Sequence, residues 1–110
     1  MSRVDARIEA PAPVFAALGS ATRLELLSRL SDGREHSITA LTEDLDLTRQ
    51  AITKHLQVLQ HAGIVNSRRV GRESRFTVRP DSISHAKDYL TRVSDQWDEA
   101  ISRLRATVEQ

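Results

Sequence analysis

The segment 47–63 reads LTRQAITKHLQVLQHAG and carries hydrogen-bonding side chains at spacings that place them on one side of a helix. Amides, hydroxyls and a cation gather there, and no aspartate or glutamate occurs in positions 47–72. Amides both donate and accept hydrogen bonds, as base edges do in the major groove of DNA, and cations bind phosphate, whereas a carboxylate would be repelled by it. This face therefore predicts contact with a DNA duplex. The plainer alternative is a solvated amphipathic helix without a ligand.

Two sets of residues make up this predicted helix. The buried side holds apolar residues at helical spacing: Leu47, Ile52, Leu56 and Leu59. The opposite side is polar: Gln50, Thr53, Lys54, Gln57 and His61. Gln50 suits bidentate recognition of adenine, and Lys54 suits guanine or phosphate. The helix N-terminus adds unpaired amides and a partial positive charge, which favour a phosphate near Thr48 and Arg49.

The positive charge of the chain is concentrated around this helix. The formal net charge of the 110 residues is only +1. Residues 48–79 nevertheless contain seven Lys and Arg against Glu73 alone, whereas the rest of the chain holds nine basic and fourteen acidic side chains. One basic segment in a nearly neutral chain indicates a local surface for a polyanion. Chance clustering on a solvated face is the alternative.

Two helices are predicted at the start of the chain. Pro11 and Pro13 suit the beginning of a helix over 11–19. Ser20 is a predicted N-cap for the second helix, which ends at Gly33. Its apolar positions repeat at helical spacing: Leu24, Leu27 and Leu30.

A pair of closely spaced helices is predicted over 37–63. Ser37 is a predicted N-cap of the first, and Thr48 is a predicted N-cap of the second, which ends at Gly63. The first helix of the pair has three buried positions: Ile38, Leu41 and Leu45. Only two or three residues separate the pair, which is typical of a helix-turn-helix.

The period of the pattern changes to two after Gly63. The stretches IVNSRR and SRFTV flank a turn in which Gly71 supplies backbone freedom, which predicts a β-hairpin over 64–79. In its second strand, Phe76 and Val78 share one side. The other side is polar: Arg75, Thr77 and Arg79. The chain returns to helix over about 82–108.

This order of elements predicts one domain over 1–110 that is mainly α with a small β-hairpin. It matches a winged helix-turn-helix, with the helix-turn-helix over 37–63 and the wing over 64–79. The helices at about 11–19 and 82–108 are predicted to be N- and C-terminal dimerisation helices. No internal repeat is present.

Long stretches of the chain resemble the ArsR (arsenical-resistance repressor) family of bacterial winged-helix regulators. The stretches are LGSATRLELLSRL and LTEDLDLTRQAITKHLQVLQHAGIVNSRRVGRESRFTV, and the resemblance covers about residues 14–79. Its most specific parts are three: Thr22-Arg23, His55-Leu56 within the Leu47–Leu59 pattern, and Ala62-Gly63-Ile64-Val65 before the Arg68-Arg69 and Gly71-Arg72 pairs. The resemblance implies a sequence-specific homodimer that binds double-stranded operator DNA of imperfect dyad symmetry and usually represses its own operon.

Position by position, the resemblance implies that two sets of residues contact DNA. In the helix these are Thr48, Arg49, Gln50, Thr53, Lys54 and His55. On the wing these are Arg68, Arg69, Arg72 and Arg75. Each wing arginine would make a sequence-independent phosphate contact. His55 lies near the buried side, so binding a phosphate and completing the edge of the core are both open to it.

The chain departs from the metal-sensing members of the family, which place a Cys-x-Cys pair where Ser37 and Thr39 stand here. Neutral hydroxyls bind soft metals poorly, and the chain has no cysteine at all. A cluster of Asp81, His85 and Asp88 on the last helix is the remaining metal candidate, with ordinary polar surface as its alternative. We predict no metal and no cofactor. The sequence names no inducer: an organic ligand in the dimer interface, another protein, or autoregulation by concentration all stay open.

The last predicted helix carries apolar residues further than one small domain can cover. Its stripe is Leu90, Val93, Trp97, Ile101, Leu104 and Val108. A second copy is expected to bury it together with the first helix, at Val14, Phe15 and Leu18. Trp97 is the expected anchor of this homodimer. The alternative is a terminal helix that folds back on its own domain.

Other functions are less compatible with the sequence. The chain has no G-x-G-x-x-G, P-loop, H-E-x-x-H or G-x-S-x-G motif, so an enzyme is not expected. A pure protein-interaction module would explain the adhesive last helix but not the basic hairpin or the acid-free helix face. Neither a secretory signal nor a membrane span is predicted, which favours the cytoplasm.

Overall fold

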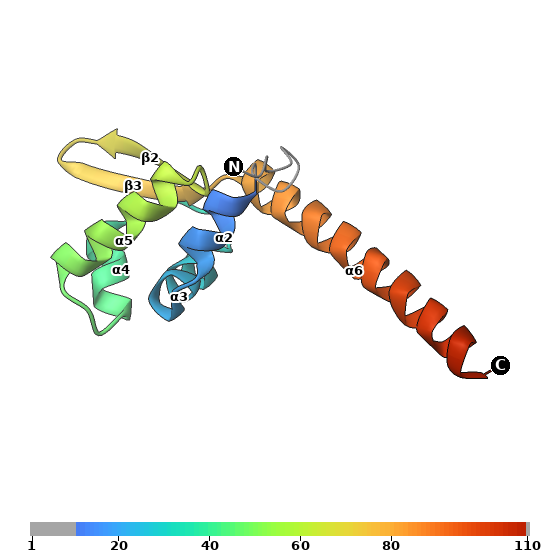
Figure 1. The fold of residues 1–110 in the computed structure, drawn as a ribbon. Coiled ribbons are helices and arrows are strands. Elements are labelled where there is room, and N and C mark those ends of the chain that lie inside the picture. Colours follow the sequence, from blue (N-terminus) through green and yellow to red (C-terminus); the bar gives the residue numbers. More distant parts are fainter. Residues whose placement is uncertain (1–10, 110) are drawn as a thin grey trace, which may run out of the picture.

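The computed structural model describes residues 11–109 and shows a small helical body with a β-hairpin and one long helix extending from it (Figure 1). The helices are α2 (Ala12–Leu18), α3 (Ala21–Leu30), α4 (Ile38–Asp44), α5 (Arg49–His61) and α6 (Pro80–Glu109). The strands are β1 (His36–Ser37), β2 (Val65–Val70) and β3 (Glu73–Val78). The predicted winged helix-turn-helix is therefore confirmed.

The three predicted N-caps all form. The hydroxyls of Ser20, Ser37 and Thr48 accept hydrogen bonds from the backbone N–H three residues ahead, at 3.3, 3.1 and 3.1 Å. Each bond satisfies an amide that a helix start otherwise leaves unpaired, so α3, α4 and α5 begin where the sequence predicts. At the other end of α5, Gly63 adopts a φ of 77°, which a glycine reaches without strain.

The sheet has a strand that the sequence did not reveal. Its order is β1-β3-β2 and both pairings are antiparallel, with His36 opposite Phe76 and Ser67 opposite Phe76 on the other side. β1 has only two residues, too few for a periodic pattern. The hairpin turn is Gly71-Arg72, and the strands reach Val70 and Glu73, so the turn is two residues shorter than the segment 70–73 that lies between the two predicted strands.

The core lies between the helices and the base of the sheet. Fully buried side chains come from α3, α4, α5, the residue before β2 and the first residue of β2: Leu26, Leu30, Leu41, Ile52, Leu56, Leu59, Ile64 and Val65. In α3 the buried line runs through Leu26 and Leu30, whereas Leu24 is 51% exposed and Leu27 is only partly buried. The predicted helical spacing of Leu24, Leu27 and Leu30 is confirmed, but only Leu30 of the three is fully buried, and Leu26 joins it in the core.

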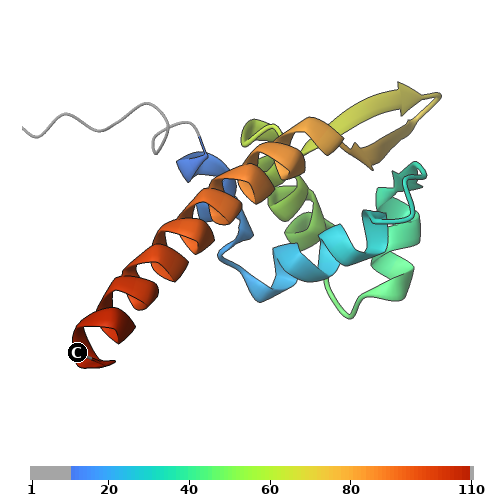
Figure 2. The same ribbon diagram turned by 90° about the vertical axis from the view of Figure 1, so that its right-hand side faces the viewer.

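α6 leaves the body instead of folding back on it. Figures 1 and 2 show its C-terminal half extending alone, on the side opposite to the hairpin. The radius of gyration is 18.5 Å, against about 13 Å for a compact chain of this size. The fold-back alternative is thus wrong for the described residues. Within residues 11–109, no helix combines the length and hydrophobicity needed to span a bilayer.

Only the first turns of α6 pack on the body. Ala86 is buried, and the ring of Tyr89 lies 5.6 Å from that of Phe15 on α2. Val14 is 8% exposed and belongs to the core of its own chain, so its side chain offers little surface to a partner. Phe15 and Leu18 are partly buried beside that core and keep an outward face.

Candidate nucleic-acid interface

The polar face of α5 is open to solvent along its N-terminal half. Gln50, Lys54 and Gln57 are exposed, while the apolar side of the same helix is fully buried. Five of its residues line one shallow hollow on the surface: Arg49, Gln50, Thr53, Lys54 and Gln57. In Figure 1 the N-terminal end of α5 and the tip of the hairpin point to the same side, away from α6. Four predicted helix contacts are thereby brought together on one surface.

The packing of α4 against α5 fixes how this face is presented. The connection from Leu45 to Thr48 is short and bends sharply, with the N–H of Leu47 donating to the carbonyl of Leu45 at 2.9 Å. Across the pair, the Arg49 guanidinium donates to the Thr39 hydroxyl at 2.9 Å. Arg49 is therefore held at the start of α4. The Thr53 hydroxyl donates to the Arg49 carbonyl at 2.8 Å, so it is left to act as an acceptor toward a ligand.

His55 lies at the edge of this face and is held by Arg23 of α3. The Arg23 Nη1 atom lies 3.3 Å from His55 Nδ1, and the same guanidinium donates through Nε to the carbonyl of Ala17 at the end of α2. Because a guanidinium can only donate, Nδ1 must be the acceptor and the neutral ring must carry its hydrogen on Nε2. This geometry is compatible with both roles left open for His55. The ring completes the edge of the core, and its Nε2–H remains a donor for a phosphate.

Arg23 positions this edge of the site, a role that no local sequence pattern indicates. It ties together three helices, since its two hydrogen bonds reach from α3 to the end of α2 and to α5. In the sequence, Thr22-Arg23 stands out only as part of the family resemblance. Its partners lie 6 and 32 residues away, and a local pattern cannot indicate the second.

The four wing arginines fall into two groups. Arg68 donates through Nε and Nη2 to Oε1 of Glu35, at 3.1 and 2.7 Å, and Arg75 lies 3.4 Å from Glu73. These two arginines are cross-strand partners on one face of the hairpin. Both already have a carboxylate as a partner, so contact with a phosphate would compete with that carboxylate.

Arg69 projects from the opposite face of the hairpin. Side chains alternate along a strand, so Arg69 shares its face with Ser67, whose hydroxyl accepts from the Gln60 amide of α5 at 3.0 Å. α5 contacts this face at Ser67, whereas Arg69, two residues nearer the turn, is exposed. Arg72 stands in the exposed two-residue turn. Among the described residues, no ion pair forms at Arg69 or Arg72.

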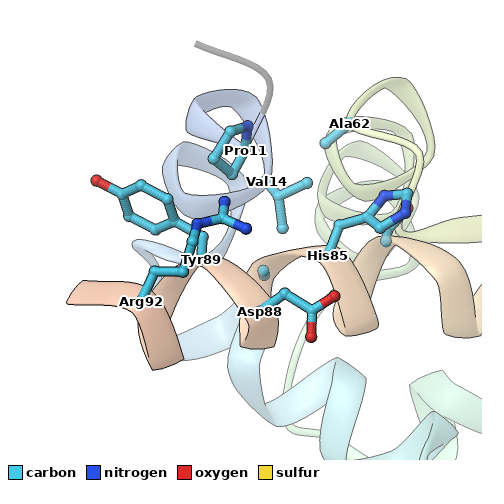
Figure 3. A pocket seen from close by; sticks show the side chains of 9 residues that line it. Pro11, Val14, Ala62, His85, Asp88, Tyr89 and Arg92 are labelled. Atoms are coloured by element: carbon cyan, nitrogen blue, oxygen red, sulfur yellow. The ribbon is translucent and has the colours of Figure 1, made fainter. Parts of the chain in front are cut away.

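The metal candidates are not assembled into a site. Within residues 11–109, no group of three or more His, Asp or Glu side chains is arranged to hold an ion. His85 and Asp88 instead line a pocket of about 330 Å³ between α2, the end of α5 and α6 (Figure 3). The figure shows the His85 ring directed toward Ala62 and the Arg92 guanidinium beside Tyr89.

His36 has a separate partner. Its Nε2 lies 2.9 Å from the Asp32 carboxylate. The hydrogen bond with His36 lowers the pKa of Asp32 below its ordinary value, and the bond from the backbone N–H of Arg34 adds to this effect. This pair closes the loop between α3 and β1.

A helix-turn-helix whose second helix exposes an acid-free polar face beside a basic hairpin defines a DNA-binding winged-helix protein, and the comparisons with known proteins agree. A helix-turn-helix domain family matches residues 18–68. The uncharacterized HTH-type transcriptional regulator YuzN of Bacillus subtilis is 46% identical over 65 residues, which cover 54% of this chain and 71% of that protein. The uncharacterized HTH-type transcriptional regulator MJ1325 of Methanocaldococcus jannaschii is 29% identical over 77 residues, which cover 70% of this chain and 86% of that protein.

Solved structures give the same result. An ArsR-like transcriptional regulator from Rhodococcus sp. RHA1 superposes with a TM-score of 0.77 at 36% identity, covering 90% of this chain and 92% of that one. HlyU from Vibrio cholerae shares the fold, with a TM-score of 0.67 at 24% identity over 80% and 92% of the two chains. The chain belongs to the ArsR-like family of winged helix-turn-helix transcriptional regulators. Its relatives and fold are those of regulators and not of enzymes, and it is a member without the cysteine metal-binding motif.

Proposed function

We propose that this transcriptional regulator is a homodimeric repressor that binds an operator of imperfect dyad symmetry. In this proposal α5 enters the major groove, and Gln50 and Lys54 read base edges there. Thr48, Arg49 and the Nε2–H of His55 bind the flanking phosphates. The Thr53 hydroxyl gives its hydrogen to the Arg49 carbonyl, so it accepts from an amino group on a base edge. The observation that carries the proposal is the acid-free α5 face, exposed at Gln50, Lys54 and Gln57 above a fully buried apolar side. A repressor acts here by occupying the promoter, in the cytoplasm, where the chromosome lies.

The wing supplies the non-specific part of the affinity. Arg69 and Arg72 are the principal phosphate contacts, since neither has a carboxylate partner among the described residues. Arg68 and Arg75 contribute less because Glu35 and Glu73 compete for them. Phosphate contacts hold the protein on the duplex without reading its sequence.

The dimer presents this surface twice. Two copies bury the exposed α6 residues, with Phe15 and Leu18 at their side, and bring two reading helices to adjacent turns of the same DNA face. The support is the exposure of Trp97, 66%, and of Leu104, 64%, which the chain itself leaves uncovered.

Two substitutions test the division between reading and holding. The protein is titrated with a duplex from its own upstream region and with a random duplex of equal length. Gln50→Ala should weaken binding to the upstream duplex by about 1–3 kcal/mol per half-site and leave random DNA nearly unaffected. Arg72→Ala should weaken both duplexes alike. Equal losses on both duplexes for Gln50→Ala would contradict the assignment of α5 as the reading helix.

A further inference from the structure

The pocket between α2, the end of α5 and α6 takes no part in the proposed contact with DNA (Figure 3). Its volume of about 330 Å³ falls within the range of sites that hold small molecules. Its floor is apolar and buried, and is formed by Pro11, Val14 and Ala86. Its polar lining comes from α6 and consists of Ser82, His85, Asp88, Tyr89 and Arg92. An apolar floor with a few convergent polar groups is typical of a ligand site.

The polar lining lies on a different side of α6 from the residues that the proposed dimer buries. At about 100° per residue, the five polar residues centre about 120° around the helix from the apolar stripe. That stripe is Leu90, Val93, Trp97, Ile101, Leu104 and Val108. Two copies that bury the stripe therefore leave the polar lining of each pocket accessible.

The pocket holds one carboxylate and one guanidinium that do not neutralise each other. Asp88 and Arg92 lie four residues apart on α6, a spacing at which opposite charges commonly pair. Both residues are described by the structure, and no ion pair joins them. Figure 3 shows their charged groups directed to different parts of the pocket, with the Arg92 guanidinium beside Tyr89. A small ligand that carries both charges can bind these two groups at once.

We propose that this pocket binds a small α-amino acid with an apolar side chain. The Arg92 guanidinium donates two hydrogen bonds to the ligand carboxylate, because its planar fork matches the two carboxylate oxygens. The ligand ammonium donates to the Asp88 carboxylate and to Oγ of Ser82. The Ser82 oxygen acts as an acceptor there, since its hydrogen is given to the Gly63 carbonyl. The apolar side chain of the ligand lies on the buried floor.

The two charges also select against ligands that carry only one. A simple carboxylate would bind Arg92 but would bring its negative charge close to Asp88. A simple amine would bind Asp88 but would bring its positive charge close to Arg92. Such unfavourable pairs lower the affinity for the wrong ligand, which is how a binding site gains specificity.

The pocket lies against the end of the helix that is proposed to enter DNA. Ala62, the residue that follows α5, lines the pocket, and Ser82 is hydrogen-bonded to Gly63. A bound amino acid therefore contacts α6 and the end of α5 together. We expect the amino acid and the upstream duplex to change each other's affinity by the same factor, because linkage is reciprocal.

Three related compounds test the need for both charges. L-leucine carries both, 4-methylpentanoate is the same molecule without the amino group, and 3-methylbutylamine is the same molecule without the carboxylate. In NMR titrations of the full chain, leucine should bind at least about tenfold more tightly than either relative and should shift the amide signals of Ala62 and Ala86. Equal affinity for 4-methylpentanoate, no binding of leucine at millimolar concentration, or shifts confined to Leu18 and Leu90 in the groove between α2 and α6 would each overturn the proposal.

Two substitutions with matched controls locate the site. Asp88→Asn and Arg92→Gln should each weaken leucine binding by about tenfold, because each removes one charged partner of the ligand. Asp98→Asn and Arg103→Gln remove the same charges from exposed positions further along α6, and they should bind leucine as the unmodified protein does. Equal losses in the control variants would show that the overall charge of α6, and not this pocket, holds the ligand.

Titrations without DNA separate this inference from the proposed function. A protein that binds leucine but shows no preference for its upstream duplex keeps the site and refutes the function, and the reverse result refutes the site alone. The coupling rests on the proposed function and needs a second titration, of the upstream duplex with and without saturating leucine. The affinity for that duplex should change by at least about fivefold, and an unchanged affinity would refute the coupling.

Discussion

Neighbouring arginines on opposite faces of the wing give the sharpest test of how this protein holds DNA. Arg68→Ala and Arg69→Ala remove the same side chain one residue apart on β2. Arg68 is bound to Glu35 at 2.7 Å, whereas Arg69 lies on the other face with no acidic partner among the described residues. The two substitutions therefore change the formal charge equally. We expect only Arg69→Ala to remove a phosphate contact that is available without breaking an ion pair.

The magnitude follows from counterion release. Each phosphate contact contributes about 0.9 to the slope of log affinity against log salt, and the proposed dimer makes each contact twice. Arg69→Ala should therefore lower the slope by about 1.8. When salt is raised from about 50 to about 200 mM, this variant should lose about tenfold less affinity than the unmodified protein does. Arg68→Ala should change the slope by less than half as much.

The assay is a fluorescence anisotropy titration of a labelled upstream duplex at four or five salt concentrations. Glu35→Gln serves as the control, because it leaves Arg68 in place and frees it for phosphate. That variant should raise both the affinity and the slope. If Arg68→Ala lowers the slope as much as Arg69→Ala does, the ion pair with Glu35 does not restrain Arg68 and the division of the wing into two faces has no functional meaning.

Three further results are expected. Trp97→Glu should weaken the dimer by at least about 2 kcal/mol, roughly thirtyfold in the dissociation constant. Sedimentation should then show monomers, and titration with the upstream duplex should show little binding. A dimer that still binds DNA tightly would contradict the interface. Arg23→Met should lower the free energy of unfolding by about 1–3 kcal/mol, because the Ala17 carbonyl loses its hydrogen-bond donor. It should also change the ¹⁵N shifts of the His55 ring, because no donor then holds Nδ1 as the acceptor. Unaltered ring shifts would refute the tautomer assignment. Asp32→Asn should lower the free energy of unfolding, measured with denaturant, above about pH 4, where the Asp32 carboxylate is charged. The difference from the unmodified protein should vanish as the pH falls through the lowered pKa of Asp32. A difference that persists at lower pH would mean that the carboxylate charge is not what stabilises the loop.

The sequence predicted those parts of the fold that depend on local chemistry. Ser20, Ser37 and Thr48 cap their helices because a hydroxyl at a helix start needs only the three residues that follow. The hairpin was predictable because the period of two in β2 and β3 is also a local pattern, read within each strand. The grouping of Gln50 and Lys54 on one exposed face followed from helical geometry alone.

Features that depend on distant residues were missed. β1 is recognisable only by its pairing with β3, and the choice of Leu26 over Leu24 depends on where α5 lies. The same applies to the site. Seven basic residues in one segment predicted a basic surface, but the partner that removes Arg68 from it, Glu35, lies 33 residues earlier. Charge counted along the chain therefore overestimated the positive surface of the wing.

The junction between β3 and α6 contains almost no slack. Arg79 alone separates the two elements, and its N–H donates to the Ile64 carbonyl at 2.7 Å. The Ser82 hydroxyl donates to the carbonyl of Gly63, just past the end of α5. These two hydrogen bonds connect α6 both to the base of the wing and to the end of α5. In the proposed dimer, a change in the angle between the two α6 helices would therefore also change the distance between the two α5 helices, and with it the operator spacing that fits.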